Sequence, residues 1–289
     1  QVQLVVNDEL SVGPEPIALN VLYEDDSIIA VSKAAGMVVH PAPGNWNGTF
    51  VNALLHHLDR QNSAGGGSGG GGISGGFSGG SGGNDRLRAG VVHRLDKGTT
   101  GVLLAAKSQS MQAKLSRLFA ERRVRKSYVV VCVGNSGGGA DAGPDGAVID
   151  VPIGRHPIHR QKMCAVPVGM VAGTGTRPAR SVVRTAAFDG RLSVAEVAIE
   201  TGRTHQIRVH MQHRRTPVAG DDLYGNGDWN RRVAQRFGLA RPLLHAHSMS
   251  FEHPDTGRLI SIMAPLPADL LAVVRSIYPE VDTERPAWI

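Results

Sequence analysis

The stretch that decides the fold reads Val91-Val-His-Arg-Leu-Asp-Lys-Gly-Thr-Thr-Gly-Val-Leu-Leu-Ala-Ala-Lys107. An apolar segment leads into Arg94 and Asp96, a turn rich in Gly and Thr follows, and a second apolar segment begins at Gly101. Charged residues placed between two buried strands cost free energy unless they are paired. The stretch therefore predicts either a structural Arg–Asp pair at a turn or a carboxylate held in a cleft beside an arginine. Spacing alone does not choose between these two interpretations.

A second polar stretch reads Glu200-Thr-Gly-Arg-Thr-His-Gln-Ile-Arg-Val-His-Met-Gln-His213. Arg203 and Arg208 could contact phosphates or a carboxylate. We expect a short helix that opens at His205 and Gln206, where backbone N–H groups also favour anions. A solvated polar helix is the plainer interpretation, but apolar residues alternate with the charged ones, so part of the polar face is expected to point inward.

Three further motifs accompany these stretches. They are Val38-Val-His-Pro-Ala-Pro-Gly-Asn45, Pro217-Val-Ala-Gly-Asp-Asp-Leu-Tyr-Gly225 and Leu244-His-Ala-His247. With Arg94-Leu-Asp96 and Gly202-Arg-Thr-His-Gln-Ile-Arg-Val-His210, the ordered set resembles the RluA-type pseudouridine synthases. The resemblance is strongest to the branch that modifies large-subunit ribosomal RNA, including organellar enzymes of plants and algae, and it runs from about Val21 to about Leu271.

The resemblance implies an α+β fold: a single pseudouridine synthase catalytic domain with a central mixed, largely antiparallel sheet and flanking helices. Asp96 would be the catalytic carboxylate, Tyr128 would stack on the base and accept a proton, and Arg208 would pair with the Asp96 carboxylate. Arg94 would help to fill the space left by a flipped uridine, and Leu244 would be an apolar wall of the pocket. The residues assigned to RNA or substrate binding are Arg94, His93, Arg203, His205, Gln206 and Leu244.

The implied reaction explains these residue types. The bond from uracil N1 to the sugar breaks, the base rotates, and a carbon–carbon bond forms to the same sugar. Nothing is oxidised, reduced or hydrolysed overall, so no cofactor and no metal ion are expected. An enzyme acting on a paired base must first flip it out of the helix. The expected partner is RNA, ribosomal RNA before transfer RNA.

Composition places the chain among proteins with a real core, because 41% of its 289 residues are hydrophobic. The net charge of +6 favours nucleic-acid binding only weakly, since many proteins carry such a charge for solubility. No apolar stretch is long enough to predict a membrane span. Two open alternatives are a zinc hydrolase, given 12 histidines, and a non-catalytic RNA-binding module. The histidine spacings do not match the usual zinc motif, and an intact Arg-Leu-Asp motif favours an enzyme.

The domain organisation depends on one unusual segment. The tract from 65 to 83 holds 13 of the chain's 37 glycines and cannot bury enough apolar surface to order itself. We interpret 64–83 as a disordered insertion within one catalytic domain, 17–289, because the motifs continue beyond it. Residues 1–16 resemble the tail of an S4-type RNA-binding module. The insertion favours a chloroplast or other organelle over the cytoplasm, and we expect a monomer.

Local patterns predict the individual elements. Residues 21–33 should form two strands joined by an acidic turn. Ser108 should cap a helix whose apolar face includes Met111 and Leu115. Cys132 lies in a strand-like run and is interpreted as a small buried hydrophobe. Further strands are expected at 101–107, 127–133, 193–199 and 259–263, and helices at 49–58, 204–212 and 268–277.

Overall fold

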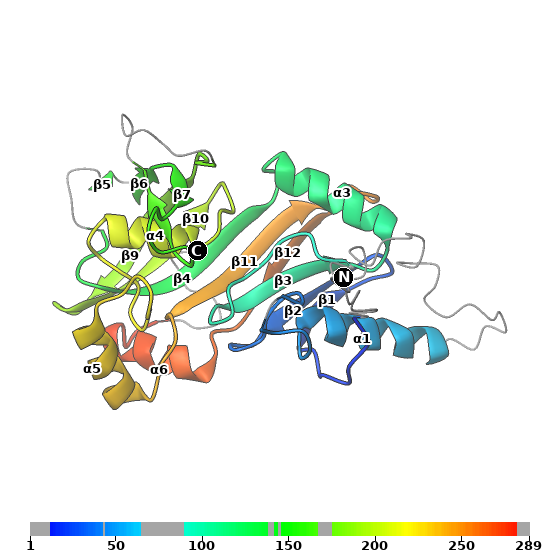
Figure 1. The fold of residues 1–289 in the computed structure, drawn as a ribbon, viewed down its shortest axis with the longest axis horizontal. Coiled ribbons are helices and arrows are strands. Elements are labelled where there is room, and N and C mark those ends of the chain that lie inside the picture. The colour runs from blue at the N-terminus through cyan, green and yellow to red at the C-terminus, as the bar shows by residue number, and fades with distance from the viewer. Residues whose placement is uncertain are drawn as a thin grey trace, which may run out of the picture. The chain divides into compact units, whose positions relative to one another are not determined.

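The structure, a computed structural model, describes residues 12–42, 44–64, 90–137, 142–143, 146–166 and 175–281 (Figure 1). The Gly-rich insertion predicted at 64–83 therefore lies outside the described residues except for its first position, and so do 1–11 of the predicted S4-type tail. The chain forms two compact units. Unit 1 comprises Gln1–Lys97 and Leu103–Ala120, and unit 2 comprises Gly98–Val102 and Glu121–Ile289.

Unit 1 begins with the two predicted strands, β1 (Val21–Glu24) and β2 (Ile28–Lys33), which pair antiparallel. The acidic turn between them is held by the Asp25 carboxylate, which accepts hydrogen bonds from the backbone N–H groups of Ser27 and Ile28 at 2.8 and 2.9 Å. An aspartate that bonds to its own turn in this way is a common means of fixing a tight connection. The predicted hairpin is confirmed.

Helix α1 (Phe50–Ala64) begins one residue after Thr49, close to the predicted start, and continues past the predicted end at Leu58. Its first turn is closed reciprocally: Thr49 N–H donates to Asn52 Oδ1 at 3.0 Å, and the Thr49 hydroxyl lies at 3.4 Å from Asn52 N. Asn52 also donates to the Gly13 carbonyl at 2.8 Å. The described end of the predicted S4-type tail is therefore bonded to α1.

Strand β3 (Thr100–Ala106) starts in unit 2 and ends in unit 1, where α3 (Gln109–Ala120) follows it. The Ser108 hydroxyl accepts a hydrogen bond from Met111 N–H at 3.2 Å, which confirms the predicted cap. Met111, Leu115 and Leu118 form the buried face of α3, as their spacing predicts.

The sheet of unit 2 is mixed and largely antiparallel, as predicted. Its strands are β4 (Arg125–Val133), β5 (Ala142–Gly143), β6 (Gly146–Asp150), β9 (Arg180–Phe188), β10 (Leu192–Ile199), β11 (Leu244–Glu252) and β12 (Leu259–Met263). The order is β11-β4-β10-β9-β6-β5, with antiparallel neighbours throughout, and β12 pairs antiparallel with β11. The start of β3 pairs with β11 in parallel. A separate hairpin joins β7 (Ile153–Arg155) and β8 (Met163–Ala165).

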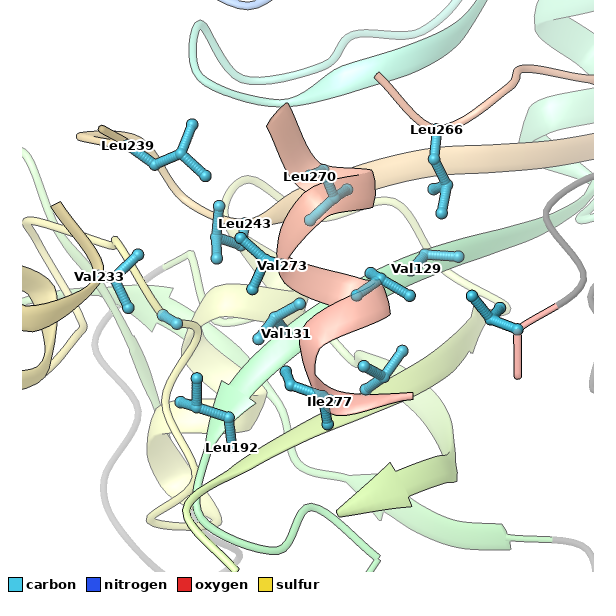
Figure 2. Close-up of a cluster of buried hydrophobic side chains, with 14 residues drawn as sticks. Val129, Val131, Leu192, Val233, Leu239, Leu243, Leu266, Leu270, Val273 and Ile277 are labelled. Carbon is cyan, nitrogen blue, oxygen red and sulfur yellow. The ribbon is translucent and has the colours of Figure 1, made fainter. Parts of the chain in front are cut away.

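One face of this sheet carries the main core of unit 2. Leu270, Val273 and Ile277 of α6 (Ala268–Ile277) pack on Val129 and Val131 of β4, as Figure 2 shows. Each such buried side chain stabilises the fold by roughly 1.5–3 kcal/mol. Helix α5 (Gly227–Phe237) adds its single buried residue to the same cluster. The bounds of α6 are those predicted from the sequence.

The opposite face is covered by α4 (Gln206–His213), whose buried Gln206 and His210 bond to the hydroxyl of Ser181 on β9. Successive strand residues point to opposite faces, so Tyr128 and Cys132 of β4 lie on the α4 face, away from α6. Cys132 is fully buried, as predicted, and burial raises the pKa of its thiol. Among the described residues, no helix has the length and apolarity required to span a bilayer.

Candidate active site

Asp96 lies in a loop of unit 1 that is tied down immediately after the aspartate. The carbonyl oxygen of Lys97 accepts hydrogen bonds from Gly36 N–H at 2.8 Å and from Lys33 Nζ at 3.3 Å. Asp96 itself is partly exposed, whereas the preceding Leu95 is buried. Asp96 therefore keeps part of its surface accessible, in a loop whose backbone is fixed by the buried Leu95 side chain before it and the bonded Lys97 carbonyl after it.

Lys33 is the residue that ties this loop to the rest of unit 1. It is 1% exposed and also donates to the carbonyls of Ala34 and Met37, at 2.8 and 2.9 Å. Three carbonyl acceptors match the three N–H donors of an ammonium group. The cation thus holds the 34–37 turn and the Asp96 loop together, a role that the sequence analysis did not foresee.

The two residues before Leu95 differ in their surroundings. His93 Nε2 accepts a hydrogen bond from Leu104 N–H on β3 at 2.9 Å, and its ring stacks on Phe119 of α3 with the centroids 4.9 Å apart. Arg94 is exposed. His93 therefore anchors the loop to β3 and α3, while the guanidinium of Arg94 is accessible to a ligand.

Tyr128 and Leu244 lie on the same face of the unit 2 sheet. Tyr128 on β4 is directly opposite Ala246 of β11, and Leu244 is opposite Val130. Directly paired residues share a face, so Leu244 and Tyr128 are diagonal neighbours on that face. They are 4% and 8% exposed. The predicted aromatic platform and the predicted apolar wall are thus brought together within unit 2.

The position of β11 is fixed by its contact with the start of β3. His245 Nδ1 is 2.8 Å from the Thr100 hydroxyl, and Nε2 is 3.1 Å from the Ala264 carbonyl. Burial lowers the pKa of His245 to about 4, which keeps this ring neutral at pH 7. Gly101 lies opposite Ala246 with a φ of +109°, and a Cβ there would come within 2.1 Å of the Ala246 carbonyl oxygen. Only glycine permits this close approach.

Arg208 makes a buried, bidentate ion pair with Asp221. Its Nε and Nη2 lie 2.6 and 2.8 Å from the two carboxylate oxygens, and the Asp221 side chain is fully buried. Asp221 also accepts from the N–H groups of Leu223 and Tyr224 at 2.9 and 3.0 Å. The guanidinium carbon lies 5.0 Å from the centroid of the Tyr224 ring. Bidentate pairing fixes both the position and the plane of a guanidinium. Pairing of Arg208 with Asp96, which belongs to the other unit, stays a prediction.

Gln206 and His205 organise the loop that leads into α4. Gln206 is 3% exposed, and its amide donates to the Arg180 carbonyl and the Ser181 hydroxyl while accepting from Thr201 and from Arg203 N–H. All four of its hydrogen-bonding positions are therefore used inside the protein. His205 has a φ of 57°, and its Nδ1 is 2.8 Å from the Tyr224 hydroxyl. Any effect of Gln206 on RNA binding is consequently expected to act through the loop.

Another histidine of this helix is also committed to the fold. His210 Nδ1 is 2.9 Å from the Ser181 hydroxyl, and Nε2 is 3.0 Å from the Val151 carbonyl. Burial is the main cause of its lowered pKa. Within the ranges that the structure describes, no three His, Cys, Asp or Glu side chains are grouped so that they could hold a metal ion.

The candidate residues thus form two local groups. Unit 1 brings together Arg94, Asp96 and the anchoring His93. Unit 2 holds Tyr128 with Leu244 on one face, and α4 and its preceding loop supply the arginines. The sequence did not predict roles for Lys33 and Asp221. Asp221 lies within the motif Pro217–Gly225, and Lys33 is a charged residue at the end of a buried strand, so both carried a signal.

Known proteins resemble this chain along most of its length. Ribosomal large subunit pseudouridine synthase D of Xanthomonas campestris is 39% identical over 285 residues, which cover 96% of this chain and 75% of that protein. The chain belongs to the RluA-type pseudouridine synthases. The family model described as RNA pseudouridylate synthase matches residues 80–213, which include Asp96, Tyr128 and Arg208.

Other pseudouridine synthases are also similar to this chain in sequence or in structure. RNA pseudouridine synthase 2, chloroplastic, of Arabidopsis thaliana is 39% identical over 291 residues, covering 92% of this chain and 66% of that protein. Ribosomal large subunit pseudouridine synthase D of Neisseria meningitidis serogroup B is also 39% identical and covers 93% of this chain, but the chain spans only 64% of its length. The solved structure of Human RNA Pseudouridylate Synthase Domain Containing 4 is 20% identical, with a TM-score of 0.65 over 89% of this chain and 92% of that chain. This likeness confirms the α+β fold.

Proposed function

We propose that this protein converts specific uridines of structured RNA, foremost ribosomal RNA, into pseudouridine. The observation that carries the proposal is Asp96 in its Arg-Leu-Asp loop, partly exposed and held by the bonded Lys97 carbonyl. Membership of the pseudouridine synthase family supports the reaction type. The names of the bacterial relatives, which refer to the large ribosomal subunit, support the choice of RNA.

The reaction needs an anion near the anomeric carbon and a base that takes up one proton. As the bond between C1′ and N1 breaks, the electron pair goes to uracil, and the sugar carbon becomes electron-poor. The Asp96 carboxylate assists there, either by bonding to the sugar or by removing a sugar proton to give a glycal. The uracil rotates and C5 bonds to C1′, and in the same step either the bond from Asp96 to the sugar breaks or Asp96 returns the proton to C2′ of the glycal. The proton on C5 is then lost to a base, and N1 regains a proton. Atoms and electrons balance without a cofactor.

The other residues are proposed to hold the base and the strand. Tyr128 stacks on uracil and accepts the C5 proton, and its place beside Leu244 supports a flat apolar pocket. Arg94, being exposed, enters the space that the flipped uridine leaves. Arg208 is proposed to stabilise the Asp96 carboxylate. The buried Asp221 supports this role because its bidentate pair fixes the position and plane of the Arg208 guanidinium.

The decisive experiment replaces Asp96 by Asn, which keeps the shape of the side chain and removes the anion. RNA labelled with tritium at uridine C5 releases tritium when the C5–C1′ bond forms, so turnover is counted directly. We expect Asp96→Asn to abolish release and to bind RNA within about twofold of the parent, since the phosphate contacts that dominate affinity are kept. The matched control, Asp26→Asn, removes one carboxylate from an exposed turn of the same unit and should change neither quantity. Release by Asp96→Asn at the parental rate would assign the nucleophile elsewhere, and no release by the parent on any cellular RNA would favour a non-catalytic RNA-binding protein.

We further propose an organellar site of action, the chloroplast, and a monomeric state. The chloroplastic relative from Arabidopsis thaliana supports the location. Mapping pseudouridines in chloroplast and cytoplasmic RNA after deletion of the gene tests both the location and the choice of ribosomal over transfer RNA. Light scattering of the purified protein tests the monomer.

A further inference from the structure

Four basic side chains gather on unit 2 next to the α4 loop. This cationic patch consists of Arg122, in the turn before β4, Lys126 on β4, Arg177 before β9, and Arg203 before α4. Arg122 and Arg177 are exposed, and Lys126 and Arg203 are half-buried. A Cβ on Gly202 would lie 3.8 Å from Lys126 Nζ, which places the ammonium against the loop that carries Arg203.

The charges in the patch are held close to one another by the backbone. Arg203 Nε donates to the carbonyl of Pro178 at 3.0 Å, and the neighbouring Arg177 pairs through its own backbone with Ile153 at 2.9 Å in both directions. Arg122 adopts a left-handed φ of 59°, a conformation that a glycine would adopt at less cost. The segment that carries Arg177 is thus bonded to Arg203, and Lys126 of β4 lies against the same loop; Arg122 belongs to the group because its charge acts on Arg203.

The like charges of the cationic patch repel one another. Burial and the nearby Arg203 guanidinium lower the pKa of Lys126 to about 8. Burial and the guanidinium groups of Arg177 and Arg122 lower the pKa of Arg203. Glu200, the nearest carboxylate in sequence to Arg203, forms its ion pair with Arg180. An anion bound among these groups would relieve the repulsion.

The patch lies beside the proposed base pocket. Lys126 and Tyr128 are two residues apart on β4, so they point to the same face of the sheet and are separated by about 7 Å along the strand. This distance is comparable to the length of one nucleotide of an RNA chain. A phosphate held by the patch would therefore belong to the nucleotides next to the base on Tyr128.

We propose that Arg122, Lys126, Arg177 and Arg203 bind the phosphates of the RNA backbone that flank the target uridine. The proposal rests on the proposed function for the identity of the RNA, and the patch itself recognises phosphate rather than sequence. Phosphate contacts release counterions, so the affinity depends on salt with a slope of about −0.7 to −0.9 per phosphate neutralised.

The test measures the affinity of the full chain for a ribosomal RNA stem-loop from 50 to 200 mM KCl. The variant is Arg177→Gln, an exposed position where loss of the fold is not expected. Its slope of log K against log salt should be smaller than the parent's by about 1, with weaker binding to every RNA sequence. A slope smaller by 1 means that its affinity falls about fourfold less over this salt range. The matched control is Arg236→Gln, exposed on α5 of the opposite face, which should keep the parental slope.

The outcomes separate this inference from the proposed function. Equal slopes for Arg177→Gln and Arg236→Gln would overturn the phosphate site, even if the parent forms pseudouridine. A reduced slope for Arg177→Gln in a protein that forms no pseudouridine would support the phosphate site and reject the activity. Arg203→Gln provides a second variant, and the same reduction in slope is expected there.

Discussion

Replacing Lys33 by Met tests whether the buried ammonium positions the catalytic loop. Methionine has a similar length and volume, so the change mainly removes the donors to the Ala34, Met37 and Lys97 carbonyls. All three carbonyls lose the bond from Lys33. The Lys97 carbonyl still accepts a hydrogen bond from Gly36 N–H at 2.8 Å, whereas those of Ala34 and Met37 lose their bond without this replacement. An unsatisfied buried polar group costs about 1–3 kcal/mol. Ala34 lies at an exposed position where water can replace the lost donor, so we expect a total loss of stability of roughly 1–3 kcal/mol.

The larger effect is expected on the rate. The segment just after Asp96 would lose one of its two donors, and a misplacement of about 1 Å can reduce a rate about 100-fold. We expect the single-turnover rate of tritium release at saturating RNA to fall about 10- to 100-fold. Urea unfolding measures the stability, and the rate is measured well below the unfolding transition.

The matched control is Lys107→Met in the same unit. Lys107 is also largely buried, 15% exposed, and donates to Glu24 Oε1 and the Asp25 carbonyl, both at 2.9 Å, with no bond to the Asp96 loop. It should lose stability while keeping its rate. If Lys33→Met turns over RNA as fast as Lys107→Met, Lys33 contributes only to the fold, and the reasoning from the Lys97 carbonyl is wrong.

Three further predictions follow from unit 2. Asp221→Asn should destabilise the protein by roughly 3 kcal/mol, because it removes the buried, bidentate counter-charge of Arg208 and leaves the exposed Asp222 carboxylate at 3.8 Å as a weaker one. An unchanged urea midpoint would mean that Asp222 is a sufficient counter-charge. Tyr128→Phe should keep RNA affinity and lose about 100-fold or more in single-turnover rate, since the ring can still stack without its hydroxyl, whereas equal losses in both would indicate a structural tyrosine. Burial lowers the pKa of His245 to about 4, so the unfolded chain binds the extra proton first and stability should fall as pH drops from about 6.5 to 4. The urea midpoint should fall less with decreasing pH in His245→Gln than in the parent. If the midpoints of the two proteins fall in parallel, groups other than His245 cause the loss of stability in acid.

The elements that the sequence predicted are those whose pattern is local and regular. Helix α6 has apolar residues at a helical spacing and was predicted with its bounds, and the hairpin of β1 and β2 has an aspartate turn between two apolar runs. Helix α5 was missed because its apolar stripe is narrow: Trp229, Val233 and Phe237 recur every fourth residue among polar ones, and only Val233 is fully buried. Strand β11 was missed because His245, His247 and serines interrupt it. Its stability comes from partners distant in the chain, which a local pattern does not reveal.

In the candidate site, too, some features follow from the sequence and others do not. Motif order predicts Asp96, Tyr128 and Arg208 as catalytic residues, which stays a prediction, and the inward polar face of α4 followed from the alternation of residue types. The pairing of charges did not follow, because a sequence shows which groups must be compensated but not which partner reaches them. Asp221 compensates Arg208 from 13 positions away, and backbone carbonyls, which have no sequence signature, receive Lys33.

The pairing of β3 with β11 has a consequence for how the protein is made. Thr100 and His245 bond to each other across 145 positions of the chain. A ribosome adds about 5–20 residues per second, so His245 is synthesised roughly 7–30 s after Thr100. During that interval Gly98–Val102 has been synthesised but lacks the strand it needs in unit 2. Unpaired apolar strands are the segments on which nascent chains aggregate. Folding of this protein is therefore expected to benefit from chaperones that shield the region around residue 100 until strand β11, in the last sixth of the chain, emerges.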